Sequence, residues 1–451
     1  MTTPTRARNN RRRSPAADRQ PPEANRQTPG ATPPSPAPTA PPATSFGDLP
    51  LHPALLATLA GQGLGVPSPI QAAALPDAVA GHDVLGRART GSGKTLAFGL
   101  ALLTRLAGQR SQPRQPIALV LVPTRELAAQ VTTALEPYAR AVKLRTCTVV
   151  GGLSLNRQAE ALRRGAEVVI ATPGRLNDLV ERGDCLLDKI TVSVLDEADQ
   201  MADMGFLPQV SKLLARTDRA GQRMLFSATL DGDVDKLVRR FLTTPARHSV
   251  DLPAAVVPRM DHHLLHIEAA DKTSTTAQIG AREGRVIMFV GTKHRADRLA
   301  RQLLASGVPA AALHGGKSQP QRARALEQFR TGTINALIAT DLAARGIHID
   351  DLDLVVNVDP PGDAKDYLHR GGRTARAGRS GTVVTLVLPD QHRDTTRLLA
   401  AAGIAAQSLR VRPGDAELAR ITGARTPSGV PVVPKPQPTA GSAPGRRRRG
   451  R

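Results

Sequence analysis

The stretch Ala88-Arg89-Thr90-Gly91-Ser92-Gly93-Lys94-Thr95 decides the fold of this chain. It follows an apolar run, Asp83-Val84-Leu85-Gly86, that predicts a short buried strand, and it precedes an apolar-periodic segment that predicts a helix. A Gly-rich loop between a strand and a helix is typical of a phosphate site, because successive backbone N–H groups and the helix N-terminus point at the anion. The stretch therefore predicts that the chain binds a nucleoside triphosphate.

Each part of this loop has an expected role. Gly91 and Gly93 supply backbone conformations that a β-carbon would forbid. Lys94 can reach the β- and γ-phosphates, and the Thr95 hydroxyl can ligate Mg²⁺. Ala88 stands where the usual pattern has its first Gly, and the alternative interpretation is a Gly-rich turn before an amphipathic helix. The predicted nucleotide-binding residues of the loop are Arg89, Thr90, Gly91, Ser92, Gly93, Lys94 and Thr95.

The charge of the chain points to a polyanionic partner. Its 451 residues contain 61 Lys and Arg against 39 Asp and Glu, a formal net charge of +22. Such an excess favours nucleic acid over a membrane as the partner, and a merely solvated basic surface is the alternative. Residues 1–45 contain seven Arg against two acids, and residues 425–451 contain six Arg and one Lys with no acid.

Two cysteines, Cys147 and Cys185, are too few for a disulfide framework or a zinc site, and they predict buried thiols in a reducing compartment. No apolar run approaches the ~20 residues that a membrane-spanning helix needs. The N-terminus contains Arg but lacks the apolar segment of a secretory signal. We therefore expect a cytoplasmic protein without membrane contact.

Apolar runs alternate with helical segments after the loop, and this alternation predicts parallel sheets with helical crossovers. The predicted strands are Ile117–Val122, Thr146–Val150, Val168–Ala171, Val192–Leu195 and Met224–Phe226, then Val286–Val290, Ala310–Leu313, Ala336–Ala339, Leu354–Val358 and Thr382–Leu388. Polar clusters follow the strands, as expected at the carboxyl edge where such sheets bind ligands. The expected fold class is α/β, with two tandem parallel-sheet domains.

Composition sets the domain boundaries. Residues 1–45 form a Pro- and Arg-rich tail that we expect to be disordered, because it has too few apolar side chains to offset chain entropy. The first, nucleotide-binding domain covers 46–250, and a linker covers 251–260. The second domain covers 261–405, and 406–451 is expected to be a basic flexible tail.

An acidic pair closes one predicted strand of the first domain. Asp196 stands where a Mg²⁺-holding carboxylate is expected beside a phosphate loop. Glu197 would orient and deprotonate the attacking water. The alternative is an acidic pair that caps a helix, which is common in α/β proteins. The pair becomes strong evidence because it follows a phosphate loop in the same sheet.

These residues occur in an order that resembles the DEAD-box ATP-dependent RNA helicases of superfamily 2. The resemblance runs from Phe46 to about Leu388, and it implies two tandem RecA-like domains. The matching elements, in family order, are Phe46 and Gln71, Ala88–Thr95, Pro123–Ala128, Gly151-Gly152, Thr172–Arg175, Asp196–Asp199, Ser227–Thr229, Phe289–Lys293, Gln319–Arg322, Ala339–Gly346 and His369–Gly378.

The resemblance implies roles around ATP and Mg²⁺. Gln71 would recognise the adenine edge, and Phe46, Arg345 and Gly346 would also belong to the nucleotide site. Arg373 and Arg376 would reach the γ-phosphate when the two domains close, as arginine fingers do. The catalytic set would thus be Lys94, Asp196, Glu197, Arg373 and Arg376. Coupling between the nucleotide and closure would involve Asp199, Ser227, Thr229 and His369.

The resemblance also implies an RNA surface on both domains. The expected contacts are Thr124, Arg125, Gly151, Gly152, Thr172, Gly174 and Arg175 in the first domain and Thr292, Gln319, Arg322 and Thr340 in the second. Small, hydroxyl, amide and basic groups suit phosphates and 2′-hydroxyls more than base edges. We expect sequence-independent, salt-sensitive binding by a monomer, with ribonucleoprotein or ribosome-assembly partners as a further expectation.

Three residues depart from the family pattern. Leu64 stands where an aromatic residue usually stacks on adenine, Gly371 replaces an aliphatic residue, and His348 replaces an Asp that contacts the ribose. Two other classes of function stay open at this stage. One is an ATP-independent RNA chaperone, which would not need Lys94 or Glu197, and the other is an ATP-driven DNA translocase.

Overall fold

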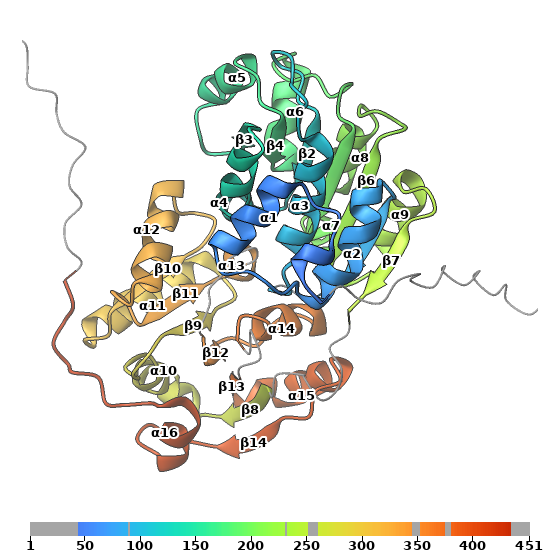
Figure 1. Ribbon diagram of the computed structural model, residues 1–451. Helices are drawn as coiled ribbons and strands as arrows, with labels where there is room; N and C mark the ends of the chain where they lie inside the picture. Colours follow the sequence, from blue (N-terminus) through green and yellow to red (C-terminus); the bar gives the residue numbers. More distant parts are fainter. Residues whose placement is uncertain are drawn as a thin grey trace, which may run out of the picture. The chain divides into compact units, whose positions relative to one another are not determined.

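The computed structural model describes residues 44–88, 91–230, 232–250, 260–344, 352–374 and 380–433. Within them the chain forms two seven-stranded sheets in which every strand pair is parallel. Helices cover both faces of each sheet (Figure 1). The α/β class predicted from the sequence is confirmed.

The first sheet has the strand order β3-β4-β2-β5-β6-β1-β7. Its strands are β1 (Val84–Arg87), β2 (Ala118–Leu121), β3 (Thr146–Val149), β4 (Val168–Ala171), β5 (Val192–Asp196), β6 (Gln222–Ser227) and β7 (Ala246–Ser249). Its helices are η1 (Phe46–Asp48), α1 (Pro53–Gly61), α2 (Pro69–Ala80), α3 (Lys94–Leu106), α4 (Arg125–Ala141), α5 (Leu155–Arg163), α6 (Pro173–Glu181), α7 (Ala198–Asp203), α8 (Leu207–Leu214) and α9 (Gly232–Phe241).

Two hydrophobic clusters sandwich this sheet, because successive strand residues point to opposite faces. Val84 of β1 and Val120 of β2 join the cluster formed with α1 to α4, whereas Leu85 and Leu121 join the cluster formed with α5 to α9. Strands buried on both faces read as continuous apolar runs, and this explains why β2, β4 and β5 were predictable from the sequence.

One close contact fixes the strand that leads into the phosphate loop. A β-carbon on Gly86 of β1 would lie 2.5 Å from the ring of Phe226 on β6, so only glycine allows this approach. The Phe226 ring in turn packs against Phe98 of α3, with 5.6 Å between the ring centroids. These contacts position β1, β6 and α3 relative to one another.

The second sheet repeats the same order, as β10-β11-β9-β12-β13-β8-β14. Its strands are β8 (Met260–His266), β9 (Val286–Phe289), β10 (Ala310–Leu313), β11 (Ala336–Ala339), β12 (Leu354–Asn357), β13 (Gly381–Val387) and β14 (Gln407–Arg410). Its helices are η3 (Ala269–Asp271), α10 (Lys272–Gly280), α11 (Lys293–Ala305), α12 (Gln319–Arg330), α13 (Asp341–Ala344), α14 (Ala364–Gly371), η4 (Pro389–Gln391), α15 (His392–Ala401) and α16 (Ala416–Thr422).

The second domain extends beyond its predicted end at residue 405. Strand β14 pairs with β8, and Val411 and Leu418 are buried in the cluster that also holds α10 and α11. Residues 406–433 therefore belong to the domain and not to the flexible tail predicted from composition. Polar β14, with the sequence Gln-Ser-Leu-Arg, gives no apolar signal because it lies at the sheet edge and is largely exposed.

The structure also changes the start of this domain. Strand β8 begins at Met260, inside the segment 251–260 that composition assigned to a linker, whose other residues lie outside the described ones. Of the predicted tails, residues 1–43 and 434–451 also lie outside the described residues. No helix among the described residues has the length and apolar character needed to cross a membrane.

Candidate active site and nucleic-acid interface

The phosphate loop begins where β1 ends and leads directly into α3. Gly91 and Gly93 have φ angles of 85° and 94°, in the left-handed region that favours glycine. Gly93 is the N-cap residue of α3, so the helix begins at Lys94. Arg89 and Thr90 lie outside the described residues. The predicted strand–loop–helix is confirmed, with the positive end of α3 at the loop.

Lys94 is a buried cation at this helix start. Its side chain is 6% exposed, and its Nζ donates a hydrogen bond of 2.9 Å to the carbonyl oxygen of Ala88. A carbonyl oxygen is neutral, so this hydrogen bond brings no opposite charge to the ammonium group. A buried ammonium group of this kind is suited to an anionic ligand such as a triphosphate.

Gln71 contacts the loop itself. Its Nε2 donates to the Gly93 carbonyl oxygen at 3.0 Å, and its Oε1 accepts from the Ser68 backbone N–H at 2.7 Å. A β-carbon on Gly93 would lie 2.5 Å from the Gln71 Nε2, so the loop and α2 are in close contact. Gln71 therefore supports the loop in this structure, and its recognition of adenine stays a prediction.

Phe46 is buried in the first domain, and its membership of the nucleotide site stays a prediction. Its ring is 4% exposed and belongs to the hydrophobic cluster on the α1–α4 face of the sheet. Its backbone N–H donates to the Gly65 carbonyl oxygen at 3.1 Å. In this structure Phe46 packs in the hydrophobic core of the first domain. Leu64, at the position of the missing aromatic residue, is 38% exposed.

The acidic pair lies at the carboxyl end of β5. Asp196 is 3% exposed, and burial raises the pKa of its carboxyl group to about 7, with a further contribution from the Glu197 charge and against the effect of Lys94. A carboxylate whose charge is this costly favours a nearby cation. Asp196, together with the Thr95 hydroxyl in the first turn of α3, therefore fits Mg²⁺.

Glu197 has an unusual backbone conformation. Its φ and ψ are both 53°, in the left-handed region that non-glycine residues rarely adopt, and its N–H donates to Asp196 Oδ1 at 3.0 Å. Such local strain persists where the surrounding structure holds it, and it is common at functional sites. The turn aims consecutive residues in different directions, so the two carboxylates can have different roles.

Asp199 links the carboxyl end of β5 to the carboxyl end of β6. Its Oδ2 accepts hydrogen bonds from the backbone N–H groups of Ala228 and Thr229, at 3.2 and 3.0 Å, and from the Thr229 hydroxyl at 3.1 Å. Ser227 completes the junction: its Oγ accepts from the Asp199 N–H at 3.2 Å, and its carbonyl oxygen accepts from the Ala88 N–H at 3.1 Å. The predicted coupling residues of the first domain therefore form one network with the phosphate loop.

The predicted RNA residues of the first domain gather on the other half of the sheet. Thr124, Gly151 and Thr172 follow β2, β3 and β4, which are neighbours in the order β3-β4-β2. The nucleotide residues follow β1, β5 and β6 instead. Because the carboxyl ends of parallel strands share one edge, the two sets lie side by side on that edge.

Contacts within this RNA set confirm that its loops meet. Arg125 Nη1 donates to the Gly151 carbonyl oxygen at 3.4 Å, and a β-carbon on Gly152 would lie 2.2 Å from the same guanidinium. Arg175 Nη1 donates to the Leu153 carbonyl oxygen at 2.8 Å. Thr172 is the N-cap residue of α6, with Gly174 in its first turn. Two guanidinium groups thus lie against one loop.

The second sheet places its predicted RNA residues in the same way. Thr292, Gln319 and Thr340 follow β9, β10 and β11, which are neighbours in the order β10-β11-β9. Thr292 is the N-cap residue of α11, where its Oγ1 accepts from the Arg295 N–H at 3.2 Å. Arg322 lies in the first turn of α12, and its Nη2 donates to the Ala343 carbonyl oxygen at 3.4 Å.

The predicted arginine fingers are described only in part. His369 lies in α14, and Arg373 follows that helix and is 5% exposed, with its backbone N–H donating to the Arg370 carbonyl oxygen at 3.1 Å. Arg376, Arg345, Gly346 and the variant residue His348 lie outside the described residues.

Arg370 is a positioning residue to which the sequence assigned no role. Its guanidinium donates to both carboxylate oxygens of Asp341, at 2.5 and 2.8 Å, and to Asn357 Oδ1 and the Asp359 carbonyl oxygen, at 3.0 and 2.8 Å. It also lies 5.0 Å from the ring centroid of Phe289. This buried residue links α14 to the ends of β9 and β12 and to the start of α13. Its position between the predicted site residues His369 and Arg373 was the sequence signal that could have indicated its role.

Comparisons with known proteins agree with this geometry. A family model described as DEAD/DEAH box helicase matches residues 68–237, and one described as Helicase conserved C-terminal domain matches residues 271–378. The chain is 41% identical, over 82% of its length, to DEAD-box ATP-dependent RNA helicase 28 of Oryza sativa subsp. japonica, and it spans 46% of that protein. It is 37% identical to the ATP-dependent RNA helicase DBP2 of Ajellomyces capsulatus, over 84% of this chain and 71% of that protein.

Among solved structures, the chain is similar to S. cerevisiae Dbp5 bound to RNA and ADP BeF3. The TM-score is 0.73 at 30% sequence identity, over 84% of this chain and 99% of that chain. The chain spans about half the length of the rice relative and of the Dictyostelium discoideum relative ddx17, described as a probable ATP-dependent RNA helicase.

Proposed function

Because this chain belongs to the DEAD-box family of ATP-dependent RNA helicases, we propose that it unwinds short RNA duplexes or remodels RNA–protein complexes. It binds the sugar–phosphate backbone of RNA and closes its two domains around ATP, Mg²⁺ and RNA. It then hydrolyses ATP to ADP and phosphate. The observation that supports this most directly is the convergence of Lys94, Asp196 and Glu197, all buried, at one edge of the first sheet.

The buried residues divide the chemistry of hydrolysis. Lys94 and the backbone N–H groups of the loop bind the β- and γ-phosphates, and Thr95 and Asp196 would hold Mg²⁺. When bound, Mg²⁺ neutralises charge on the phosphate oxygens. Glu197 orients the attacking water and accepts its proton, and a positioned base of this kind contributes typically 10²–10⁴-fold to a rate.

Closure supplies the remaining groups. Arg373 and Arg376 of the second domain approach the γ-phosphate only in the closed state, where they stabilise the charge that develops in the transition state. RNA favours that state because each domain offers a set of backbone-binding residues at its sheet edge. The network of Asp199, Ser227 and Thr229 links the phosphate loop to this change, since one carboxylate holds the ends of two neighbouring strands.

The setting of this activity is part of the proposal. We propose a cytoplasmic monomer whose partners are RNA and ribonucleoprotein particles, among them ribosome-assembly intermediates. Relatives support a role in such particles: one is described as a pre-mRNA-processing helicase, and Dbp5 has a solved structure with the protein Gle1. The net charge of +22 favours a polyanionic partner independently.

The test is ATP turnover by the full chain with RNA and with DNA of the same sequence. We expect stimulation by RNA alone, and equal stimulation by DNA would favour a DNA translocase. Glu197→Gln should lower turnover at least 10²-fold while ATP and RNA still bind, whereas Lys94→Ala should weaken ATP binding itself. Glu136→Gln, an exposed glutamate of α4, is the matched control and should leave turnover unchanged.

Two outcomes would contradict this assignment. Normal turnover in Glu197→Gln would mean that another group activates the water. RNA strand separation by Lys94→Ala, with full yield and without ATP, would favour an ATP-independent chaperone.

A further inference from the structure

Asp359 is a buried carboxylate of the second domain that was not among the predicted site residues. It follows β12, and its side chain is 9% exposed. Its Oδ1 contacts Lys272 Nζ at 2.8 Å and Arg295 Nη2 at 3.1 Å, and its Oδ2 accepts a hydrogen bond from the Gly291 N–H at 3.0 Å. One carboxylate therefore joins the start of α10, the first turn of α11 and the loop between β9 and α11.

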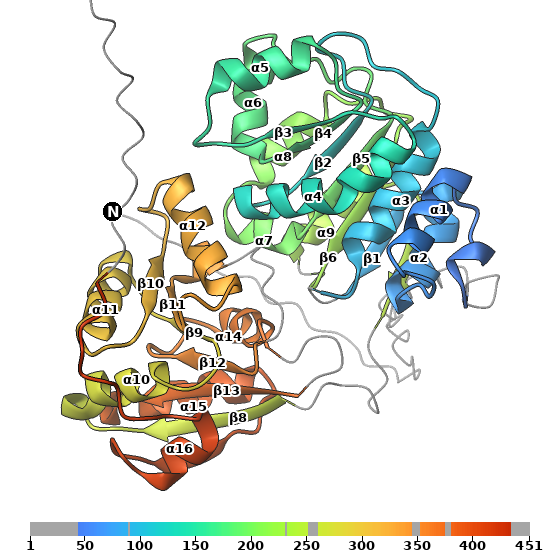
Figure 2. The ribbon, with the colours of Figure 1, turned by 60° about the vertical axis from the view of Figure 1, so that its left-hand side comes forward.

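The main chain of Asp359 is bound on two further sides. Its N–H donates to the Phe289 carbonyl oxygen at 3.1 Å, at the end of β9. Its carbonyl oxygen accepts from Arg370 Nη1 at 2.8 Å, and Arg370 lies in α14 shortly before Arg373. Figure 2 shows β9, β12 and α14 close together in this domain. Asp359 therefore connects the loop before Thr292 with the helix that precedes Arg373.

The corresponding position in the first domain belongs to the phosphate site. Because the two sheets share one strand order, β8 takes the place of β1 and β12 takes that of β5. The helix after β1 begins at Lys94, and the helix α10 after β8 begins at Lys272. Lys94 donates to a backbone carbonyl oxygen, whereas Lys272 is paired with Asp359. The second domain thus has an internal ion pair where the first domain has its phosphate-binding lysine.

This ion pair fixes the position of Asp359. The Lys272 side chain is 14% exposed, so both charges lie largely out of water and each depends on the other. Arg295 is 57% exposed, and it can turn toward a phosphate while Lys272 still neutralises the carboxylate. The buried side of the cluster is therefore constant, and the RNA side can change partner.

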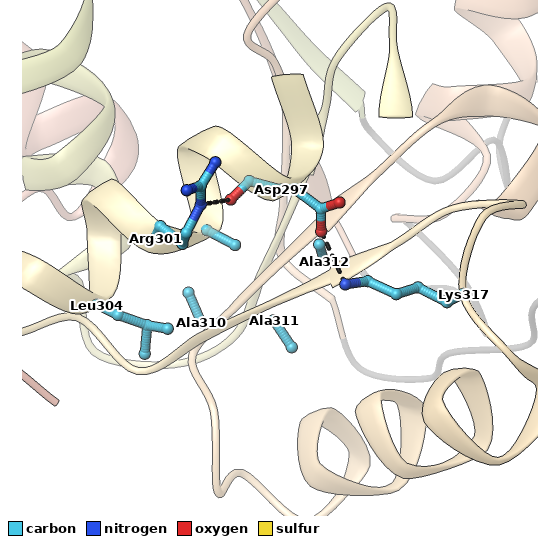
Figure 3. A pocket seen from close by; sticks show the side chains of 8 residues that line it. Asp297, Arg301, Leu304, Ala310, Ala311, Ala312 and Lys317 are labelled. Carbon is cyan, nitrogen blue, oxygen red and sulfur yellow. Dashed lines mark hydrogen bonds and ion pairs between the residues drawn. The ribbon is translucent and has the colours of Figure 1, made fainter. Parts of the chain in front are cut away.

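A second carboxylate holds α11 from a different side, because residues two apart on a helix do not face each other. Asp297 of this helix contacts Lys317 at 2.8 Å and His314 at 3.1 Å, both from the segment after β10. Figure 3 shows the contact with Lys317. That segment leads into α12, which begins at the predicted RNA residue Gln319. Two carboxylates thus set the position of the start of α11, and with it that of Thr292.

We propose that Asp359 is a positioning residue that couples RNA binding at Thr292 to the placement of Arg373. RNA that binds the Thr292 loop moves Gly291, and Asp359 transmits the movement to α14, because its side chain holds the loop and its carbonyl oxygen holds Arg370. The physical basis of the coupling is this one shared residue. The effect on turnover rests on the proposed function, whereas the link between the loop and α14 does not.

The link is tested by amide hydrogen exchange of the full chain. Asp359→Ala combined with Lys272→Met removes the carboxylate and its buried cation together, so that neither charge is left alone. We expect residues 291–295 and 364–371 both to exchange about tenfold faster in this double variant, because both lose a common anchor. Asp359→Asn combined with Lys272→Gln keeps an acceptor for the Gly291 N–H and should retain most of the protection.

Asp353→Asn is the matched control. Asp353 precedes β12, at the end opposite Asp359, and it pairs with the buried Arg282. This variant should exchange like the natural chain in both segments. Faster exchange of residues 291–295 alone in the double variant, or equal acceleration in the control, would overturn the link.

A further measurement needs no variant to fold. Single-stranded RNA added to the natural chain should slow amide exchange in residues 364–371 as well as in residues 291–295. Protection of residues 291–295 alone would overturn the coupling.

Turnover separates coupling from RNA binding alone. Thr292→Ala removes an RNA contact and should raise the KM for RNA while kcat is retained. The Asp359→Ala, Lys272→Met variant should lower kcat at saturating RNA about tenfold. It should still bind ATP, because Lys94 and the phosphate loop lie in the first domain.

The outcomes of the turnover assay assign a failure to one part of the inference. A raised KM for RNA with an unchanged kcat in the double variant would mean that Asp359 only shapes the RNA loop, and this would overturn the coupling. Absence of RNA stimulation in the natural chain would contradict the proposed function. The exchange measurements would then still decide whether Asp359 links the loop to α14.

Discussion

Substitution of Gly371 tests how the C-terminal end of α14, which precedes Arg373, packs in the second domain. It is the last residue of α14, where the family pattern has an aliphatic residue, and its φ is not in the left-handed region. A β-carbon there would lie 3.5 Å from Met260 Sδ and 3.6 Å from Val383 Cγ2, at ordinary van der Waals distances. The site therefore has room for alanine.

The expected gain follows from two effects. Replacing glycine by alanine inside a helix is worth about 0.5–1 kcal/mol, and less at a helix end. Burying one methyl group adds up to about 0.8 kcal/mol. We expect Gly371→Ala to raise the free energy of unfolding of the second domain by about 1 kcal/mol, which corresponds to a Tm increase of about 2–4 °C.

The measurement is calorimetric or urea unfolding of the full chain, with the second-domain transition assigned from residues 260–433. Gly372→Ala is the matched control, because its β-carbon would lie only 3.3 Å from the Leu368 carbonyl oxygen and should bring no gain. RNA-stimulated turnover should not fall in Gly371→Ala. A destabilisation beyond about 0.5 kcal/mol, or an equal gain in Gly372→Ala, would refute the reasoning.

Three further predictions concern the first domain. Asp199→Asn replaces a charged acceptor in a buried network, and it should lower stability by about 2–3 kcal/mol in urea unfolding and reduce RNA-stimulated turnover. Residues 46–250 alone contain both hydrophobic clusters of that domain, so they should fold and bind ATP. They lack Arg373, so their turnover should not be stimulated by RNA. Full RNA-stimulated turnover by this fragment would show that the second domain is not catalytic. Burial alone would raise the pKa of Glu167, but hydrogen bonds from Arg145 outweigh it and lower the pKa to about 2. Because the folded pKa lies below the unfolded value of 4.5, the stability from Glu167 is present above pH 4.5 and should be lost as the pH falls toward 2; Glu167→Gln should flatten that part of the stability–pH curve.

Local sequence signals were sufficient for the central strands and for the phosphate loop. Strands such as Val168–Ala171 and Ala336–Ala339 are buried on both faces, so their apolar runs are visible without any knowledge of neighbours. The glycines before Lys94 and the acidic pair at Asp196 are local patterns tied to phosphate and cation chemistry. The order of these motifs predicted two tandem domains, and the structure shows the same strand order in both sheets.

Arg370 and Phe46 show what depends on the tertiary structure. An arginine within a basic motif can face solvent or a ligand, and only the fold shows that Arg370 binds Asp341, Asn357 and Asp359 from different elements. An aromatic residue near a nucleotide motif can stack on a base or fill the core, and the structure places Phe46 in the core. Burial and partners come from distant segments, so residue type alone does not decide between these roles.

The sequence alone determined the class of fold, the phosphate loop and the order of the motifs, because these depend on hydrophobic runs and on glycine, lysine and acidic residues within a few positions of one another. Only the tertiary structure decided that polar β14 is an edge strand of the second sheet. It also decided that residues 424–433 lie against α10 and the C-terminal end of α11. Both are held mainly by backbone hydrogen bonds to distant segments. Every residue except proline can donate such bonds, so they leave no pattern in side-chain composition.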